Sequence, residues 1–373
     1  MKIGIDARSL SVPGGIKIYS ENLLNCLNHK KEFILMGPTH FNDFKCIPSK
    51  IKNDSILRLF YENIIIPKII KKNRVDLIHS LKSSVPILGK FKRVITVHDL
   101  NHYVNPHNYK IKDLVYWKYI FPHYVKVSDK IITISNNTKE DLIRFLNVDE
   151  GKIKVIYLAF DKKIYHKKNK SSSYNAVSKY LTKNNKHKIN FNQRVMLSVN
   201  TIHPGKNISN IIKSFDLIVG KQKDIILVII GKKGWKYREI FETYESAKNK
   251  DKIYFLGYVP DEVVANFYNI TEALIYPSLY EGFGLPILEA QACGCPVITS
   301  NVSSMPEVAG KGAILVDPYN VDDIANAMLK ITKDKKLRAK LIKEGYKNVK
   351  RFSWEKCAKE TLKVYQEVLN EKD

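Results

Sequence analysis

Short apolar runs alternate with helix-forming segments along the whole chain, and this alternation is the strongest constraint on its fold. Most runs are strand-sized, rich in Val and Ile, and lack polar alternation, which is typical of parallel strands covered on both faces. One series of expected strands covers residues 2–7, 32–36, 75–79, 93–98, 130–135 and 153–158, and a second covers residues 194–199, 224–230, 252–256, 273–276, 296–299 and 313–316. The pattern predicts an α/β protein with two doubly wound parallel sheets.

Residues 161–188 separate the two series and are rich in Lys, Asn and Ser, so this segment is expected to be a linker. We expect one domain over residues 1–180, a second over residues 190–352, and a final helical segment over residues 353–373 with Ser353 as its N-cap. The apolar stripe of this helix must be buried. Ligands of such sheets bind beyond the carboxyl ends of the strands, which places the expected site in a cleft between the domains.

The composition excludes several classes of protein. Of the 373 residues, 44% are hydrophobic and 27% are charged, which are ordinary values for a globular chain. No apolar run reaches the ~18 residues of a membrane span, and the N-terminus begins with a strand rather than a signal peptide. Five scattered cysteines fit neither a disulfide framework nor a structural zinc site. We therefore expect a cytoplasmic protein.

The net charge is unusual, because 62 Lys and Arg residues outnumber 37 Asp and Glu residues and give +25. An anionic membrane surface, nucleic acid or phosphorylated small molecules would each explain this charge, as would a general drift of composition toward Lys, Ile and Asn. No nucleic-acid motif is present, so we expect no nucleic-acid partner. The segment 56–72, with Tyr61, residues 64–66 and a lysine cluster, either contacts a membrane or is an ordinary covering helix broken near Pro67.

The most specific motif is Tyr-Glu-Gly-Phe-Gly-Leu-Pro-Ile-Leu-Glu-Ala at residues 280–290. It follows an expected buried strand and opens a helix. Gly282 and Gly284 let the backbone approach a ligand closely, and N–H groups at a helix start suit an anion. Glu281 and Glu289 flank this anion site, where a carboxylate favours a partner that donates hydrogen bonds, such as a sugar hydroxyl.

The segment resembles the Glu-x7-Glu motif of the family 4 retaining glycosyltransferases, which have the GT-B architecture of two Rossmann-like domains facing a cleft. The similarity continues through residues 292–300 and 305–308, reaches back through 231–235 and 255–259, and is densest from 195 to 318. This resemblance implies a retaining hexosyltransferase that needs neither a metal nor a cofactor and uses a nucleotide sugar as co-substrate. The implied mechanism is front-face displacement, in which the departing phosphate deprotonates the acceptor.

The resemblance also implies roles for residues of the second domain. Glu289 would bind the ribose hydroxyls of the donor, Glu281 would bind hydroxyls of the transferred sugar, and Lys206 would neutralise the diphosphate and help it leave. The backbone N–H groups that would bind the sugar and the diphosphate are those of Phe283, Gly284 and Leu285.

Val259 and the loop after the first strand of the second domain also belong to the expected donor site. Val259 would lie near the nucleotide base through its backbone. Many family members have an Arg–Lys–Asn run, and some an Arg just after the first strand, where this chain has Gly205-Lys206-Asn207 and Thr201. Lys206 is therefore the main cation expected there.

In the first domain, two features resemble parts of the family's site. Gly14 and Gly15 follow the first strand, as does the glycine loop that approaches the phosphates and the reacting centre. His98 ends a strand, where its implied role is a hydrogen bond to the donor sugar near the reacting carbon. Asp99 would either orient the His98 imidazole or cap the next segment.

The resemblance indicates the chemical classes of the donor and the acceptor. GDP-mannose is the favoured donor, with a UDP-hexose close behind. The acceptor is expected to be a saccharide or a lipid-linked saccharide in cell-surface polysaccharide synthesis, reached by peripheral contact with the inner, anionic face of the cell membrane. Residues 40–125, which would form the acceptor half of the cleft, contain no motif. The alternatives are a nucleotide-sugar epimerase or hydrolase on the same fold and, more distantly, a non-catalytic polyanion-binding protein.

Overall fold

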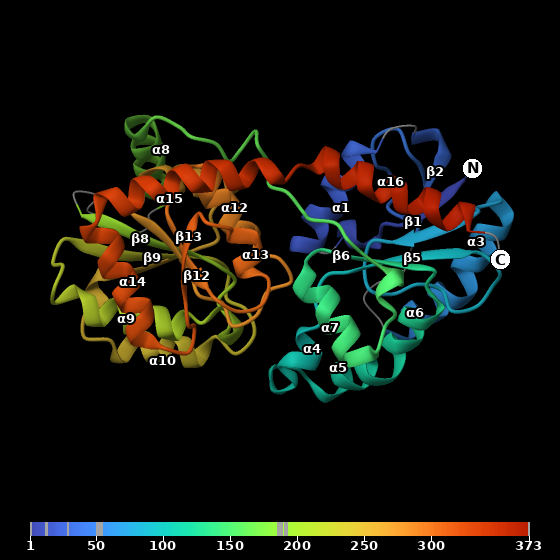
Figure 1. Cartoon of the computed structure of the whole chain (residues 1–373), viewed down its shortest axis with the longest axis horizontal. Coiled ribbons are helices and arrows are strands. Elements are labelled where there is room, and N and C mark those ends of the chain that lie inside the picture. Colours follow the sequence, from blue (N-terminus) through green and yellow to red (C-terminus); the bar gives the residue numbers. More distant parts are fainter. Residues whose placement is uncertain are drawn as a thin grey trace. The chain divides into compact units, whose positions relative to one another are not determined.

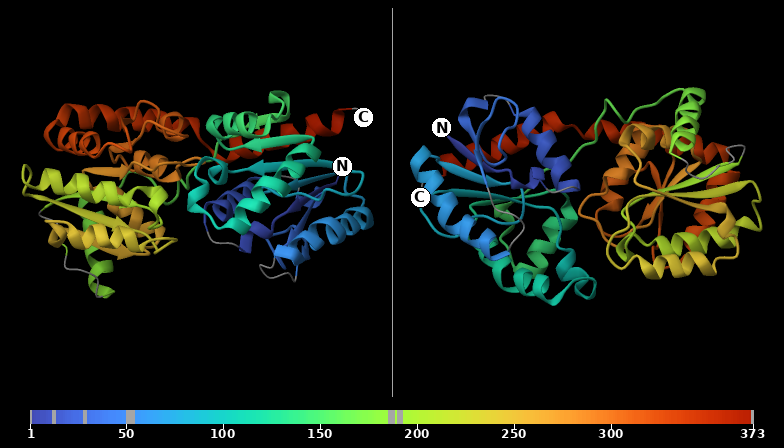
Figure 2. Two further views of the ribbon diagram at one scale, coloured as in Figure 1. Left: turned by 90° about the horizontal axis from the view of Figure 1, so that it is seen from below. Right: turned by 180° about the vertical axis from the view of Figure 1, so that it is seen from behind.

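The chain forms two compact units in the computed structural model, which describes residues 2–11, 14–27, 30–49, 55–184, 189 and 193–371 without the side chains of Lys30, Ser55, Ile56 and Arg58. Unit 1 consists of Met1–Leu158 with Ser353–Asp373, and unit 2 consists of Ala159–Phe352. Each unit contains one parallel sheet with helices on both faces (Figures 1 and 2).

The sheet of unit 1 has the order β3-β2-β1-β4-β5-β6-β7, with neighbouring strands parallel. Its strands are β1 (Ile3–Asp6), β2 (Phe33–Gly37), β3 (Lys45–Pro48), β4 (Leu77–Ser80), β5 (Lys92–Val97), β6 (Lys130–Thr133) and β7 (Ile153–Val155). The predicted strands are confirmed. The sequence did not predict β3, because a short edge strand containing Lys and Pro has no run of apolar residues.

Helices and helical turns connect these strands. The helices of unit 1 are α1 (Gly15–Cys26), α2 (Ser55–Phe60), α3 (Ile66–Asn73), α4 (Asn101–Val104), α5 (Ile111–Val115), α6 (Phe121–Val127), α7 (Asn136–Leu146) and α16 (Trp354–Asn370), with π-helical turns η3 (Tyr61–Ile65) and η5 (Tyr116–Ile120). Both π turns come shortly before a proline, Pro67 or Pro122. Proline lacks the N–H that an α-helix needs and crowds the preceding turn, so a widened turn accommodates it.

The segment 56–72 covers the sheet of unit 1 with part of its apolar side chains. Tyr61, Ile66 and Ile70 are buried in the apolar core of unit 1. Leu57 and Phe60 of the same segment are about half exposed, at 51% and 55%.

The C-terminal helix α16 is an integral part of unit 1. Ser353 is its N-cap, with Oγ accepting the Lys356 N–H at 3.0 Å. Its buried face packs against α1. At the centre of that face, Tyr365 Oη is 2.6 Å from His79 Nδ1 on β4, so the helix is fixed to the sheet.

The sheet of unit 2 has the order β10-β9-β8-β11-β12-β13, the same winding pattern as in unit 1. Its strands are β8 (Arg194–Val199), β9 (Ile225–Ile230), β10 (Ile253–Gly257), β11 (Ala273–Tyr276), β12 (Val297–Ser300) and β13 (Ala313–Val316). Its helices are α8 (Lys170–Lys183), α9 (Ile208–Val219), α10 (Arg238–Ser246), α11 (Asp261–Ile270), α12 (Leu285–Ala292), α13 (Met305–Ala309), α14 (Val321–Lys333) and α15 (Lys335–Asn348). The predicted strands are confirmed here too.

The predicted linker over residues 161–188 is wrong, because most of its described part is helix α8. Asn169 caps that helix by accepting the N–H groups of Ser171 and Ser172. Val177 and Leu181 are buried, and α8 packs against α11 of unit 2. The boundary between the units therefore lies near residue 158 rather than at residues 180–190.

Candidate active site

Lys206 and Glu281 meet at the carboxyl ends of β8 and β11, where the strand order of the unit 2 sheet reverses. Such a switch point is where open α/β sheets bind their ligands. Lys206 ends a helical turn, η7 (Pro204–Lys206), in the loop after β8, and Glu281 lies in the loop after β11. The two loops are joined because the Leu279 N–H donates to the Gly205 carbonyl at 2.9 Å.

The Lys206 ammonium and the Glu281 carboxylate form a shielded ion pair. Lys206 Nζ is 2.5 Å from Glu281 Oε1, and the side chains are only 17% and 11% exposed. The Tyr276 hydroxyl donates to the same oxygen at 2.7 Å. Burial would raise the pKa of Glu281, but the charge and hydrogen bond of Lys206, with help from Tyr276, hold that pKa below its ordinary value. Glu281 is therefore a carboxylate at neutral pH.

Serine hydroxyls fix the loop that carries Glu281. Ser303 Oγ accepts the Glu281 N–H at 3.2 Å and lies 2.7 Å from the Glu281 carbonyl. Ser304 Oγ donates to the carbonyls of Glu281 and Phe283, each at 2.9 Å. Gly284 follows with φ +100°, a left-handed conformation that other residues rarely adopt. The backbone turn is therefore rigid and requires glycine at this position.

The start of α12 presents hydrogen-bond donors. Within the described part of the chain, the N–H groups of Gly284 and Leu285 have no hydrogen-bond acceptor. Phe283, the third predicted donor, has a buried ring that contacts Phe352. Helix N-termini carry partial positive charge, so this backbone is suited to an anion.

Glu289 differs from Glu281 in having no ion pair with any described residue. It lies on α12, and its nearest hydroxyl, Tyr268 Oη, donates to Oε2 at 3.4 Å. Burial, reinforced by repulsion from Asp261, raises the pKa of Glu289 to about 8, against a small opposing effect of Tyr268. Glu289 is therefore largely protonated at neutral pH.

The Tyr276 hydroxyl is hydrogen-bonded to Glu281. Burial and Glu281 raise the pKa of the Tyr276 hydroxyl, and the charge of Glu289 adds to the effect. The structure thus brings Lys206 and Glu281 together, while Glu289 lies on the helix that follows, where the only hydrogen bond of its carboxyl among the described residues is from Tyr268. Val259, also predicted here, follows β10 and is buried.

His203 and Tyr276 were missed by sequence reasoning. His203 Nδ1 accepts the Gly205 N–H at 3.2 Å and so caps the turn that ends at Lys206. Burial and the neighbouring Lys206 charge lower the pKa of His203 to about 4, so the imidazole is neutral. Its position three residues before Lys206 was the available sequence signal; Tyr276 resembled any residue ending a buried strand.

The predicted residues of the first domain lie in unit 1. Gly14 has φ +127° and caps α1, and Gly15 is the first residue of that helix, while Pro13 lies outside the described residues. His98 directly follows β5, is 8% exposed, and its Nε2 lies 2.9 Å from the Leu81 carbonyl. Burial lowers the pKa of His98 to about 4, so the imidazole is neutral at pH 7. Because a carbonyl only accepts hydrogen bonds, Nε2 is the ring nitrogen that carries the hydrogen and donates the bond.

Asp99 caps the segment that follows His98. Its Oδ1 accepts the Asn101 N–H at 2.9 Å, at the start of α4. The structure thus supports the capping alternative for Asp99, and a backbone carbonyl is what orients the His98 ring.

The described residues show neither a cluster of metal ligands nor a membrane-spanning helix. They contain no group of three or more His, Cys, Asp or Glu side chains arranged to hold a metal ion. None of their helices combines the length and the apolar character that crossing a bilayer requires.

Comparison with known proteins identifies the family. Residues 33–163 match the family described as Glycosyltransferase Family 4, and residues 180–348 match Glycosyl transferases group 1. O-antigen chain mannosyltransferase B of Escherichia coli is 33% identical over 279 residues, which cover 74% of this chain and 70% of that protein. The chain belongs to the group 1 glycosyltransferases of family 4. It is therefore a retaining hexosyltransferase with a nucleotide-sugar donor and a saccharide acceptor.

Other similarities extend over most of this glycosyltransferase. A protein of Escherichia coli named UDP-Gal:alpha-D-GlcNAc-diphosphoundecaprenol alpha-1,3-galactosyltransferase is 28% identical over 303 residues, covering 78% of this chain and 75% of that protein. The structure of sucrose-phosphate synthase from Thermosynechococcus elongatus aligns with a TM-score of 0.78 at 20% identity, covering 98% of both chains. The predicted GT-B fold of two Rossmann-like domains is confirmed.

Proposed function

We propose that this glycosyltransferase transfers a hexose, with mannose favoured, from a nucleotide diphosphate sugar held at Lys206, Glu281 and Glu289 during polysaccharide synthesis. The observation that carries the proposal is the shielded Lys206–Glu281 pair at the switch point of the unit 2 sheet. The name of the O-antigen mannosyltransferase relative supports both the sugar and the type of product.

The diphosphate is proposed to lie between Lys206 and the start of α12. The free N–H groups of Gly284 and Leu285 would bind its oxygens, and the ammonium would be shared between the phosphate and Glu281. Both groups are fixed before the ligand arrives, which favours stabilisation of the charge that develops on the departing phosphate. A hydroxyl of the transferred sugar would then donate to the Glu281 carboxylate.

Glu289 is proposed to bind the ribose. Without a ligand, burial raises the pKa of Glu289 to about 8. A ribose hydroxyl that donates a hydrogen bond to the Glu289 oxygens would favour the ionised carboxylate. Donor binding is therefore expected to release a proton near neutral pH. This property distinguishes Glu289 from Glu281, which is already ionised.

The proposed mechanism is front-face displacement with an oxocarbenium-like transition state. The acceptor hydroxyl attacks the anomeric carbon on the face from which the diphosphate leaves, and its proton passes to the departing phosphate oxygen. No carboxylate nucleophile is required, so Glu281 needs only to orient the sugar. A neutral His98, held by the Leu81 carbonyl, is proposed to bond to the sugar through its remaining ring nitrogen, and Gly14 and Gly15 to lie near the phosphates.

The proposed base is guanine. Val259 is followed closely by Asp261, which opens α11. Guanine presents N1–H and N2–H groups that suit one carboxylate, whereas uracil has a single N–H donor. A thermal-shift series with GDP, UDP, GDP-mannose and UDP-hexoses tests this choice, because a ligand stabilises in proportion to the logarithm of its concentration over Kd.

The acceptor is proposed to be a saccharide carried by a lipid, used from the cytoplasmic side of a membrane. The galactosyltransferase relative, whose name includes a diphosphoundecaprenol, supports this class. The net charge of +25 supports contact with an anionic lipid surface.

Product analysis with a labelled donor tests the proposal. The wild-type chain should give an acceptor adduct, and Glu281→Gln and Glu289→Gln should each give less than about a hundredth of it. Glu242→Gln, an exposed glutamate on α10 of the same unit, is the matched control and should be unaffected. Free sugar or an epimerised nucleotide sugar without an adduct would instead support a hydrolase or an epimerase.

A further inference from the structure

Unit 2 contains a cavity of about 320 Å³ at the edge of its sheet opposite the proposed donor site. Thr271 and Glu272, which line it, directly precede β11, and Pro296 directly precedes β12. The cavity therefore lies at the amino ends of these parallel strands, whereas Lys206 and Glu281 lie beyond carboxyl ends. Its volume is within the range of about 300–1,000 Å³ that small-molecule sites occupy. The donor site does not account for it.

The charged groups of this cavity are mostly cationic. Its lining includes Lys167, Lys168, Lys170 and Arg338, and Glu272 is the one carboxylate among the described residues that line it. Glu272 is already paired with Arg338. In the part of the chain that the structure describes, none of the three lysines forms an ion pair. The cavity therefore carries positive charge that the protein itself does not compensate.

Arg338 is fixed through one of its nitrogens and keeps the other two for a ligand. Its Nη1 donates to the carbonyls of Ile331 and Thr332 at 2.5 and 3.1 Å, and lies 3.3 Å from Glu272 Oε2. Nε and Nη2 have no acceptor among the described residues. A guanidinium binds phosphate or carboxylate oxygens through two neighbouring N–H groups. Arg338 is thus held in place with a pair of donors unused.

The segment that carries the lysines is anchored to α11. Asn269 of that helix is 7% exposed; its Oδ1 accepts the Lys168 N–H at 2.7 Å and its Nδ2 donates to the His166 carbonyl at 3.1 Å. Lys170 is the first residue of α8, and Asn169 is the N-cap. A helix start carries partial positive charge, so the backbone and the side chains here favour a ligand of the same sign.

The facing wall is formed where α12 ends. Gly294 has φ +75°, and a Cβ built on it would lie 2.2 Å from the Tyr346 hydroxyl oxygen, so glycine lets Tyr346 of α15 approach closely. Tyr346 lines the cavity, and its hydroxyl forms no hydrogen bond with any described residue. The hydroxyl, the lysine ammoniums and the Arg338 nitrogens together give this cavity more unused donors than acceptors.

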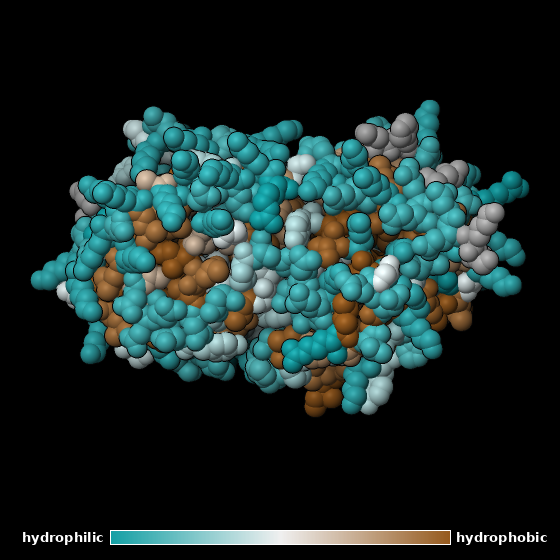
Figure 3. Space-filling model, viewed as in Figure 1, coloured by the Kyte–Doolittle hydropathy of each residue, from teal (hydrophilic) through white to brown (hydrophobic). Residues whose placement is uncertain are grey.

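The surface of the two helices beside the cavity is hydrophilic and basic. Figure 3 shows mainly hydrophilic residues over α8 and α15. Helix α15 contains six Lys or Arg residues and one Glu, and α8 contains three Lys residues and no acid. None of the large hydrophobic residues that the described chain exposes lies on either helix. The charge therefore attracts a dissolved anion, and the apolar side chains that would enter a lipid surface are missing from these helices.

We infer that this cavity binds the phosphate of a small dissolved anion, either inorganic pyrophosphate or a phosphate ester, with Arg338 and Lys170 on the phosphate oxygens. A phosphate group accepts hydrogen bonds through several oxygens and carries more charge than a monocarboxylate, which suits a lining rich in donors. The inference goes beyond the proposed function, because none of these residues belongs to the donor site.

Calorimetric titration of the full chain with inorganic pyrophosphate, glucose 6-phosphate and acetate tests this inference. The tighter of the two phosphate probes should bind at least about tenfold more tightly than acetate, and which one it is tells whether the ligand is a free or an esterified phosphate. Lys170→Glu should weaken its binding about tenfold or more, and Arg338→Lys about fivefold, because an ammonium lacks the paired donors of a guanidinium. Lys170 is exposed at a helix start that tolerates an acid, and Arg338→Lys keeps a cation beside Glu272, so both variants should fold.

A matched control separates a built site from general attraction by the positive charge. Lys179→Glu makes the same charge change at an exposed lysine of α8 that does not line the cavity. This variant should bind the phosphate probes as the wild type does. The inference is overturned if Lys170→Glu and Lys179→Glu behave alike, if Arg338→Lys binds as the wild type does, or if neither phosphate probe binds more tightly than acetate.

The same titrations with excess GDP keep the donor site separate from the cavity. Binding of the phosphate probes should persist, and its loss on addition of GDP would place the anion at the donor site and overturn the inference. GDP binding should be unchanged by Lys170→Glu and lost in Glu289→Gln. A chain that binds a phosphate probe through Lys170 but binds no GDP would contradict the proposed function and leave the cavity assignment standing.

Discussion

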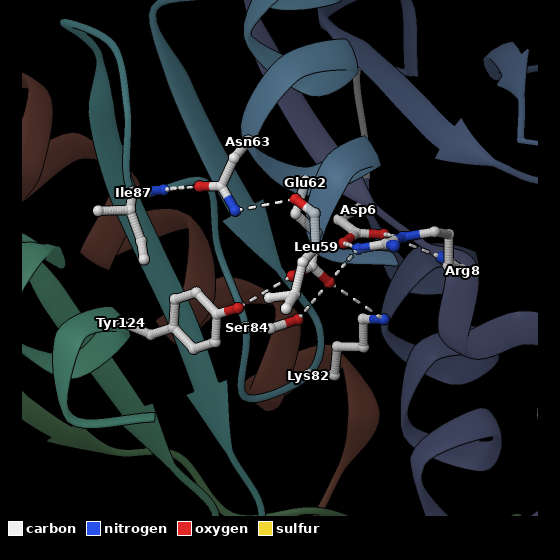
Figure 4. Close-up of polar contacts among 9 residues, drawn as sticks. All are labelled: Asp6, Arg8, Leu59, Glu62, Asn63, Lys82, Ser84, Ile87 and Tyr124. Carbon is white, nitrogen blue, oxygen red and sulfur yellow. Dashed lines mark hydrogen bonds and ion pairs between the residues drawn. The ribbon is translucent and has the colours of Figure 1, made fainter. Parts of the chain in front are cut away.

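The two sheets wind in the same order but carry opposite chemistry at their switch points. In unit 2, Glu281 and Glu289 lie beside donor N–H groups, which suits a hydroxyl-rich ligand with a diphosphate. In unit 1, the buried Asp6 and Glu62 are paired with Arg8, and Lys82 also lies close to Glu62 (Figure 4). The side chains that line the neighbouring cavity of unit 1, among them Ile16, Lys112 and Trp117, are mainly apolar or basic. The same backbone design therefore carries two different sets of side chains at its switch point, and the loop residues after the strands decide which.

The same contrast exists on a smaller scale within unit 2. Glu281 has a cation 2.5 Å away and stays ionised, whereas Glu289 has none and holds a proton up to about pH 8. Two glutamates eight residues apart thus differ in protonation state before any ligand binds, because of what surrounds them rather than their residue type.

The largest expected effect tests whether the acids of unit 1 are structural. Glu62→Ala leaves Arg8 and Lys82 with less compensation in a buried site, so the free energy of unfolding should fall by about 3–5 kcal/mol. Glu21→Ala, which removes a 40% exposed partner of Lys17, should cost less than about 1 kcal/mol. Urea denaturation compares the two, and equal losses would mean that the network does not stabilise unit 1.

The next effect tests whether the pair in unit 2 is catalytic. Lys206→Met should lower kcat by about 10²–10³, because the departing phosphate loses its cation. It should also destabilise the protein by leaving the Glu281 carboxylate shielded and unpaired. Adding Glu281→Gln should restore much of this stability but none of the activity. If the double variant regains activity, Lys206 serves only to neutralise Glu281.

The stability of the protein at acid pH tests the pairing of Asp6 with Arg8. Burial opposes ionisation, but Arg8 holds the pKa of Asp6 at about 2, below the value of about 3.9 in an unfolded chain. The stability from Asp6 is thus present above about pH 4 and is lost as the pH falls toward 2, by about 2 kcal/mol in all. Asp6→Asn should show a flatter stability profile across this range in thermal denaturation, and an unchanged profile would contradict the assignment.

Proton release tests the account of Glu289. Below its pKa of about 8, donor affinity should rise up to about tenfold per pH unit, because ribose binding requires the carboxylate. Calorimetry of GDP binding in two buffers of different ionisation enthalpy should detect close to one proton released at pH 7. Glu289→Gln should bind weakly and without proton release. Release that persists in this variant would place the titrating group elsewhere.

The same raised pKa has a consequence for stability. The pKa of Glu289 is higher in the folded protein than in the unfolded chain, so its protonated form stabilises the fold fully below about pH 4.5. This stabilisation is lost progressively as the pH rises toward 8. Glu289→Gln should therefore raise the melting temperature at pH 8.5 more than at pH 5. Such a gain is expected where a site is built for binding rather than for stability.

Features carried by local sequence could be predicted, and features made by distant residues could not. The strands and the 280–290 motif were predictable because hydrophobic runs and glycine turns act over a few residues. Helix α8 was missed because only Ser173, Val177 and Leu181 are buried on it, within a segment that is otherwise polar. The Asp6–Arg8–Glu62 network joins residues up to 56 positions apart, and no local pattern connects them.

The proposed donor site lies in unit 2, between a lysine, a helix start and two glutamates. A crystal structure with GDP bound tests it most directly. We expect diphosphate oxygens within hydrogen-bond distance of Lys206 Nζ and of the Gly284 and Leu285 N–H groups, with ribose hydroxyls on Glu289. A diphosphate bound away from the start of α12, or a ribose that does not contact Glu289, would contradict it.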